Sequence, residues 1–238
     1  MQKLILLTLW GLMGLTAIHA QITTPTVVTD RPGYSETPFS LGRNIYQIET
    51  GWRFDKLDNE AKIYLPKVWL RGGITQKLEW RAGLNTFAFS GQQSIKTEPL
   101  ELGFKYLAFE KENKRAHSFS LNAAIPLNKS NNLITFYPRF IGNHNNLFGT
   151  FGISYTAGMS INQDQALGFG TFKIDKTFKH QLNVFAEIYA ETTSNIIGSI
   201  ALSQVFKNNW QWDLSAGISK TTSYYAAFGL SRRIIAQK

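Results

Sequence analysis

Charged side chains of both signs recur at alternate positions of segments that are otherwise apolar. In a narrow enclosed space such charges must pair with one another or stay hydrated, whereas in a water-filled passage they would select which solutes pass. Two roles therefore stay open for this set: a structural ion-pair network, or the lining of a solute pathway. The candidate residues are Glu49, Arg53, Glu79, Arg81, Glu101, Lys105, Arg139, Glu187 and Asp213.

The segments that carry these charges have a period of two. From Tyr46 to Phe54, mostly apolar side chains alternate with Gln, Glu, Gly and Arg, and residues 77–85 and 210–218 repeat the pattern. This is the period of a β-strand with one apolar and one polar face. The charged residues are thus expected on one face of a sheet, and a one-residue slip in register would move them to the other face.

Alternating segments of about ten residues, separated by short turns, are typical of transmembrane β-barrels, whose strand number in bacterial single chains is even. The sequence therefore predicts an all-β protein, an antiparallel up-and-down transmembrane barrel of about 12 strands over residues 44–238. A soluble β-sandwich stays open as an alternative, since the apolar faces could instead form its core. The expected strands are 44–54, 62–71, 76–88, 98–109, one containing 119–125, 133–141, 147–158, 166–178, one beginning at 182, 196–206, 210–218 and 224–234.

The connections between these strands are short. Pro138 cannot donate a ladder hydrogen bond, so it predicts a bulge or a strand end. If both termini lie in the periplasm, one set of turns faces that side. These turns are expected near Gly72, Glu110, Asn143, Lys179 and Lys207.

The N-terminus carries an export signal. Lys3, the apolar run Leu4–Ala17 and the small-residue site ending at Ala20 predict a signal peptide over residues 1–20. A membrane anchor, the alternative, would need about 20 apolar residues. Together with the barrel pattern, this signal predicts a bacterial outer-membrane location.

Composition limits the remaining classes. The absence of cysteine excludes a disulfide-stapled domain and a lipoprotein. The net charge of +9 is spread along the chain without a Lys/Arg block, so no nucleic-acid partner is expected. Acidic lipid head groups or anionic solutes fit this charge better.

Residues 21–43 form a lead-in that is rich in Pro, Thr and Ser and lacks sustained periodicity. Its most distinctive residues are Asp30, Arg31 and Pro32. Arginine often anchors irregular backbone to carboxylates, so this motif can dock the lead-in against the barrel. Alternatively, the lead-in plugs the lumen and gates it.

No catalytic, metal or cofactor site is expected. His117 neighbours Ser118 and Ser120, but odd separations along a strand point to opposite faces, and a hydrolase needs serine and histidine within hydrogen-bond reach. His144 and His180 fall in expected turns, and the zinc-protease and phosphate-loop motifs are absent.

The lead-in also carries a family resemblance. Thr29–Pro32, Ser35–Pro38 and Tyr46–Gly51 resemble the opening of the outer-membrane family named for a MetA pathway of phenol degradation, often labelled a transporter. Leu102–Tyr106, Trp212–Gly217 and Phe228–Arg233 are similar to later strands of that family. The resemblance implies an outer-membrane barrel that passes small compounds, aromatic or apolar ones among them. The chain departs from that pattern at Ile234–Lys238, which lacks a terminal aromatic residue.

We therefore expect a barrel that passes or binds a small solute without catalysis and without a cofactor. Its expected partners are outer-membrane lipid, the solute and the barrel-assembly machinery. The alternatives are a structural or envelope-interaction barrel with an occluded lumen, and, less favoured, a barrel enzyme acting on lipid.

Overall fold

The computed structural model describes residues 27–31, 33–57, 60–84, 88–90, 93–96, 99–112, 114–127, 133–147, 150–193, 195–207, 209–219 and 224–236. The expected signal peptide, residues 21–26 of the lead-in and Pro32 lie outside this part of the chain. The strands are β1 Ile45–Leu57, β2 Glu60–Gly73, β3 Leu78–Leu84, β4 Ala88–Ser90, β5 Gln93–Lys96, β6 Leu100–Lys111, β7 Arg115–Ile125, β8 Thr135–Leu147, β9 Phe151–Ile161, β10 Ala166–Thr177, β11 Leu182–Glu191, β12 Ile196–Phe206, β13 Trp210–Ser219 and β14 Tyr224–Ile235.

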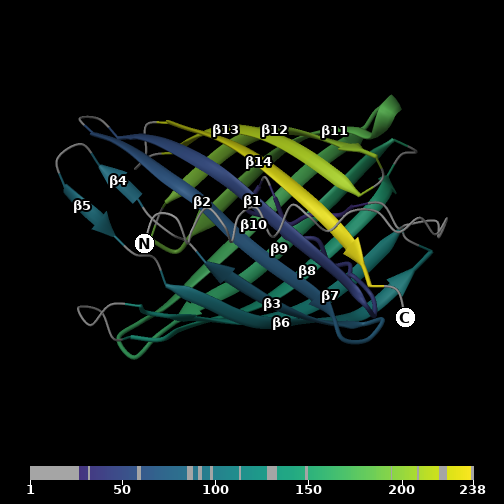
Figure 1. Cartoon of the computed structure of the whole chain (residues 1–238), viewed down its shortest axis with the longest axis horizontal. Coiled ribbons are helices and arrows are strands. Elements are labelled where there is room, and N and C mark those ends of the chain that lie inside the picture. Colours follow the sequence, from purple (N-terminus) through teal and green to yellow (C-terminus); the bar gives the residue numbers. More distant parts are fainter. Residues whose placement is uncertain are drawn as a thin grey trace, which may run out of the picture.

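The strands form one closed antiparallel sheet. β1 pairs with β14 along one edge and with β2 along the other, so no edge stays open between the first and last strands (Figure 1). β4 continues the register of β3 against β2, and the pairing of β4 with β5 continues that of β3 with β6. β3 with β4, and β5 with β6, therefore count as one barrel strand each, which confirms the predicted antiparallel barrel of twelve strands.

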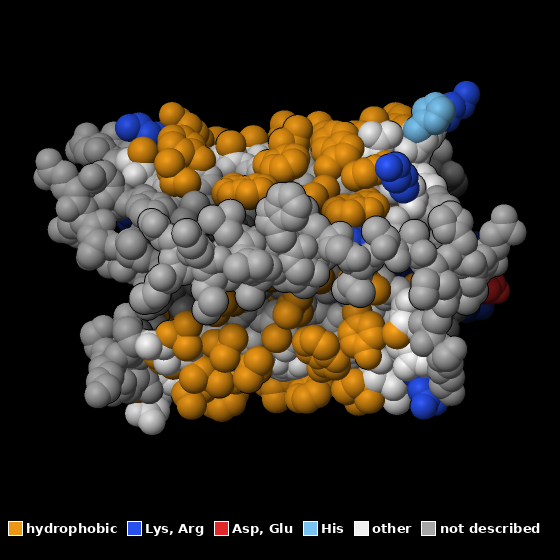
Figure 2. Space-filling model, viewed as in Figure 1, with side chains coloured by type: hydrophobic (Ala, Val, Ile, Leu, Met, Phe, Trp, Pro, Cys, Tyr) orange, Lys and Arg blue, Asp and Glu red, His pale blue; other side chains and the backbone are white. Residues whose placement is uncertain are grey.

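The two faces of the barrel reverse the arrangement of a soluble protein. Ile200 and Ile218 are 67% exposed on the outer face, whereas the carboxylates of Glu49 and Glu79 are fully buried inside. Hydrophobic side chains cover the described outer surface in Figure 2, and Lys, Arg and His gather towards the two ends. An outer apolar band with a polar interior is the pattern of a transmembrane barrel. The soluble-sandwich alternative is wrong, because it would have buried these apolar faces.

The two ends of the barrel differ. The backbone N–H of Ala236 donates to the carbonyl of Asn44 at 3.0 Å, so the chain enters and leaves the barrel at the same end. We name this the terminal end; it also holds the 3₁₀ turn Lys179–Gln181. The opposite end, which we name the loop end, carries the connections after β7, β9 and β11.

Strand β8 corrects two predictions. The turn expected near Asn143 is wrong, because β8 runs on to Leu147 and includes His144. The expected bulge or strand end at Pro138 is wrong as well. Pro138 pairs with Leu121 in a continuous ladder to β7, while the ladder to β9 has no partner for Tyr137 or Pro138 and resumes in the same register at Arg139. The gap in pairing at Pro138 is thus confined to the β9 side of the strand. The register shift in the pairing of β8 with β9 lies between His144 and Leu147.

Among the described residues, none of the helical segments has the length and apolar character needed to cross a membrane.

Candidate functional site

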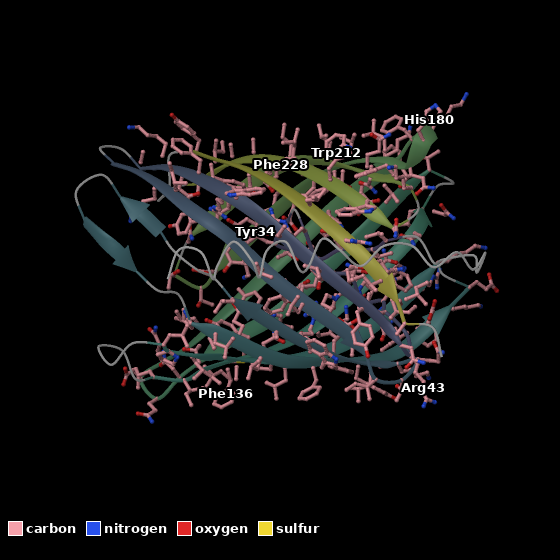
Figure 3. The ribbon with its side chains drawn as sticks, viewed as in Figure 1. Tyr34, Arg43, Phe136, His180, Trp212 and Phe228 are labelled. Atoms are coloured by element: carbon pink, nitrogen blue, oxygen red, sulfur yellow. The ribbon has the colours of Figure 1, made fainter. Side chains whose placement is uncertain are left out.

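The described part of the lead-in, residues 27–31 and 33–43, lies inside the barrel and touches opposite walls. At one wall the Gln47 side chain of β1 donates to the carbonyl oxygen of Val28 at 2.9 Å. At the other, the backbone N–H of Glu36 donates to Thr156 Oγ1 of β9 at 3.4 Å. β1 and β9 are diametrically opposite in the twelve-strand order. The lead-in therefore crosses the lumen, and Tyr34 lies near the middle of the barrel in Figure 3.

Asp30 holds the lead-in in a closed loop. Its Oδ1 accepts the backbone N–H of Thr37 at 2.9 Å, which joins two arms of the segment. Its Oδ2 faces two wall arginines, Arg71 at 3.5 Å and Arg81 in closer contact. One carboxylate thus both shapes the lead-in and fixes it to β2 and β3.

Asp30 belongs to a connected network of buried ion pairs. Glu79 of β3 contacts Arg71 at 3.0 Å, and Arg81 and Lys105 at 3.2 Å each. Glu49 of β1 also contacts Arg71 at 3.0 Å. We name the whole set the charge cluster; it consists of the cations Arg71, Arg81, Lys105 and Arg139 with the carboxylates Asp30, Glu36, Glu49 and Glu79. Its charges balance only because the lead-in supplies Asp30 and Glu36.

Glu36 bridges two arginines that lie on separate strands. Its Oε2 accepts from Arg81 Nη1 at 2.6 Å, and its Oε1 accepts from Arg139 Nη1 of β8 at 2.6 Å. Hydrogen bonds between ionised partners are shorter and stronger than those between neutral groups. We name residues Tyr34–Glu36 the tip of the lead-in; the two ion pairs of Glu36 connect this tip to both β3 and β8.

The tip of the lead-in is also held by Glu187 of β11. This carboxylate accepts the backbone N–H groups of Tyr34, at 2.6 Å, and Ser35. The Tyr34 hydroxyl accepts from Arg53 Nη1 at 2.7 Å, and its ring stacks on Tyr189 with centroids 4.8 Å apart. Burial raises the pKa of the Tyr34 phenol above its usual value, so the hydroxyl stays neutral.

Arg31 makes a separate anchor to the wall at the adjacent strands β1, β14 and β13. Its Nη2 lies 3.6 Å from Oδ1 of Asp213 in β13, whose side chain is fully buried. The guanidinium rests on two glycines of the wall, where a Cβ at Gly51 or Gly229 would collide with it. The sequence therefore leaves room on the wall for this arginine.

The lead-in separates two cavities. The loop-end cavity, of about 280 Å³, is lined by Glu36 and Arg139 and by aromatic side chains that include Tyr34, Phe169 and Tyr189. The terminal-end cavity, of about 820 Å³, is lined by a different part of the lead-in and by polar wall residues. Lead-in residues lining it include Val27, Thr29, Arg31, Thr37 and Phe39, and wall residues include Asn143, Lys173, Asn183 and Gln211.

The structure places the predicted candidates in several groups. Glu49, Glu79, Arg81, Lys105 and Arg139 come together in the charge cluster, whereas Arg53, Glu187 and Asp213 contact other parts of the lead-in. Glu101 makes its ion pair outside the cluster, to Lys67 at 3.5 Å. Of the lead-in motif, Asp30 and Arg31 are anchors, and Pro32 is outside the described residues.

Two members of the charge cluster were missing from the predicted set. Arg71 lies on the polar side of the alternation in β2, so the period alone could have identified it. Glu36 lies in the aperiodic lead-in, where no sequence pattern indicates what a side chain contacts.

The described residues show no catalytic grouping of His117 with its serine neighbours. His117 is on the outer face, where its Nε2 lies 3.0 Å from the Tyr155 hydroxyl and its ring stacks on Phe140. Ser118 is fully buried on the inner face. Within the same described part of the chain, no group of three or more His, Asp or Glu residues could hold a metal ion.

Comparison with solved structures identifies the fold. The COG4313 outer-membrane channel from Pseudomonas putida F1 superimposes with a TM-score of 0.62 at 9% identity, covering 86% of this chain and 99% of the channel. The KdgM porin in complex with disordered oligogalacturonate gives a TM-score of 0.61 at 13% identity, covering 78% of this chain and 98% of the porin. The NanC porin gives 0.54 at 4% identity, covering 81% of this chain and all of the porin.

No protein-family model and no curated protein matches the sequence. The structural neighbours are outer-membrane β-barrel channels, and at these identities the likeness shows the fold alone. The narrower resemblance to the phenol-degradation family stays a prediction.

Proposed function

We propose that the protein is a non-catalytic outer-membrane channel for small solutes, whose lumen is closed at mid-height by its own lead-in. The observation that carries this proposal is the lead-in between two cavities of one polar lumen. A purely structural plug would need only to fill space, whereas this segment leaves open volume on both sides. Outer-membrane lipid would surround the apolar outer face, after export directed by residues 1–20.

The contacts that hold the lead-in are suited to release. The anchors described above are hydrogen bonds and ion pairs to the wall, through Asp30, Arg31, Tyr34, Ser35 and Glu36. Water that enters the lumen can replace the hydrogen bonds among them at a net cost of about 0.5 to 1.5 kcal/mol for a neutral pair, whereas the buried ion pairs separate more readily when another charge replaces the lost partner. Loss of several anchors together would join the two cavities into one passage.

The loop-end cavity favours a small solute with a flat ring. Tyr34, Tyr137, Phe169 and Tyr189 supply aromatic surface, and about 280 Å³ approaches the lower limit of ordinary ligand sites. The family resemblance also points to aromatic compounds. A solute that enters from this side would meet the aromatic surface before it meets the lead-in.

The occluded structural barrel is the second candidate. The observation that favours it is the complete burial of Arg71, Arg81 and Lys105 in the described part of the chain, so water does not reach these three side chains while the lead-in is in place. Conductance separates the two functions, since a permanently occluded barrel carries no current.

The test is single-channel conductance of the purified, folded protein in a planar bilayer, with Asp30→Asn as the variant. We expect Asp30→Asn to spend more time open than the parent, because the amide loses the ion pairs to Arg71 and Arg81. Glu101→Gln is the matched control, since it removes a lumen carboxylate whose ion pair is to Lys67 of the wall, and it should behave like the parent. If neither the parent nor the variant carries current, while circular dichroism shows a folded barrel, the result would favour the structural role.

A further inference from the structure

We propose that Arg81 and Arg139 form a binding site for the carboxylate of the solute, and that Glu36 of the lead-in occupies this site while the lumen is closed. The inference rests on the proposed function and gives it a substrate class, a small solute that carries a carboxylate on a flat ring. It also gives the lead-in a chemical role, that of a tethered competitor for the solute.

The geometry around Glu36 is that of a bound carboxylate. Each of its oxygens accepts from a different guanidinium, Arg81 and Arg139, at 2.6 Å. Planar guanidinium groups are the side chains best suited to carboxylate recognition. Because the two arginines come from β3 and β8, the barrel wall supplies the site and the lead-in supplies only its occupant.

Arg139 is the part of the site that a solute can reach. Its side chain is 14% exposed and lines the loop-end cavity, whereas the Arg81 side chain is fully buried. The guanidinium of Arg139 also lies 5.3 Å from the ring centroid of Tyr137 and 5.7 Å from that of Phe169. A ring placed against these aromatic side chains would direct its carboxylate towards Arg139 and the Glu36 position.

The charge balance favours exchange of one carboxylate for another. With Glu36 displaced and Asp30 still in place, the charge cluster keeps four cations and three carboxylates, Asp30, Glu49 and Glu79. Uncompensated buried charge is strongly unfavourable, so departure of Glu36 is favoured when an incoming anion takes its place. A neutral solute cannot supply this compensation.

Displacement of Glu36 would weaken the attachment of the neighbouring lead-in residues to the wall. Glu36 directly follows Tyr34 and Ser35, whose backbone N–H groups are held by Glu187, and Ser35 Oγ donates to Thr171 Oγ1 at 2.8 Å. With the ion pairs at the tip broken, these hydrogen bonds and the Asp30 and Arg31 anchors remain. The solute would thus remove one anchor of the closed state at the point where it binds.

The experiment is isothermal titration of the folded protein in detergent with benzoate, using benzyl alcohol as the neutral probe of similar shape. In Glu36→Gln the tethered competitor is lost. A short tether supplies an effective concentration on the order of millimolar, so we expect benzoate to bind this variant about tenfold more tightly or better. In Arg139→Gln benzoate binding should be lost, and in Arg139→Lys, which keeps the charge but not the planar fork, it should be weakened.

Lys173→Gln is the matched control, since it removes one lumen cation in the terminal-end cavity, away from Glu36. It should bind benzoate as the parent does. The proposal is overturned if Glu36→Gln binds benzoate no more tightly than the parent, or if benzyl alcohol binds the variants as well as benzoate does. If Glu36 has a purely structural role, the Glu36→Gln substitution loosens the lead-in but does not make benzoate bind more tightly.

The same proteins, measured for conductance, keep this inference separate from the channel function. If the variants conduct but do not bind benzoate selectively, the proposed carboxylate site is wrong and the proposed channel function stands. If the protein binds benzoate selectively but never conducts, the proposed carboxylate site stands and the proposed channel function is wrong.

Discussion

Arg31 Nη2 lies 3.6 Å from Asp213 Oδ1, and this contact joins the lead-in to strand β13. Asp213 is fully buried, and no other ion pair to it is found among the described residues. The wall has therefore been shaped around a residue of the lead-in, with Gly51 and Gly229 leaving space for the guanidinium. Because this anchor is separate from the charge cluster, the two can be tested independently.

A double-mutant cycle on Arg31 and Asp213 measures the first anchor. Arg31→Gln leaves a buried carboxylate without its partner, and loss of one partner of a buried pair costs about 3 to 5 kcal/mol. We expect urea unfolding to show that Arg31→Gln/Asp213→Asn costs less than Arg31→Gln alone. If the cost of the double variant equals the sum of the costs of Arg31→Gln and Asp213→Asn measured separately, the two side chains do not interact.

The space at Gly229 gives a second test of the same anchor. A Cβ there meets the guanidinium of Arg31 and the carboxylate of Asp213, so Gly229→Ala should force the lead-in away from β13 and increase the open time in bilayer recordings. Overpacking of this kind costs about 1 to 3 kcal/mol. Gly198→Ala is the control, because nothing lies within 4 Å of its Cβ position. If the two alanine variants open alike, steric room at Gly229 does not matter for closure.

The outer face is tested by arginine at two depths. Ile200 lies in the middle of β12, and Ile196 begins that strand. An arginine on the lipid face costs about 2 to 4 kcal/mol at the bilayer midplane and about 0 to 1 kcal/mol near the interface. Unfolding from lipid vesicles should therefore show Ile200→Arg to be clearly less stable than Ile196→Arg. Similar losses at both positions would contradict the proposed placement of the barrel in a bilayer.

The barrel itself could be predicted because its signal is local. Along β1, Glu49 alternates with Ile48 and Thr50, and this period already separates the lumen face from the outer face. Prediction failed in β8, where the residues Gly142–Asn146 are typical of a turn. Pairing of β8 with both β7 and β9 outweighs that local preference, because two ladders stabilise the extended backbone.

The site was predicted less completely than the fold. Alternation shows that Glu79 and Arg81 share a face, but their partners are set by closure of the sheet and by the path of the lead-in. Asp30 meets Arg71 and Arg81 across 41 and 51 residues of sequence, at separations that no local pattern encodes. Because the lead-in has no periodicity, the ion pairs of Glu36 could not be predicted from the sequence.

A cysteine pair would decide whether the lead-in must move for the channel to open. The chain contains no cysteine, so Ser35→Cys/Thr171→Cys introduces the only two thiols. The native hydroxyls are 2.8 Å apart, which brings the two Cβ atoms close to the separation of about 3.5 to 4.5 Å that a disulfide requires. Oxidation should hold the tip of the lead-in against β10 and abolish conductance, and dithiothreitol should restore it. Ser35→Cys alone, treated in the same way, controls for the oxidant. Current through the oxidised double variant, with the disulfide verified by mass spectrometry, would show that solutes pass without displacement of the tip.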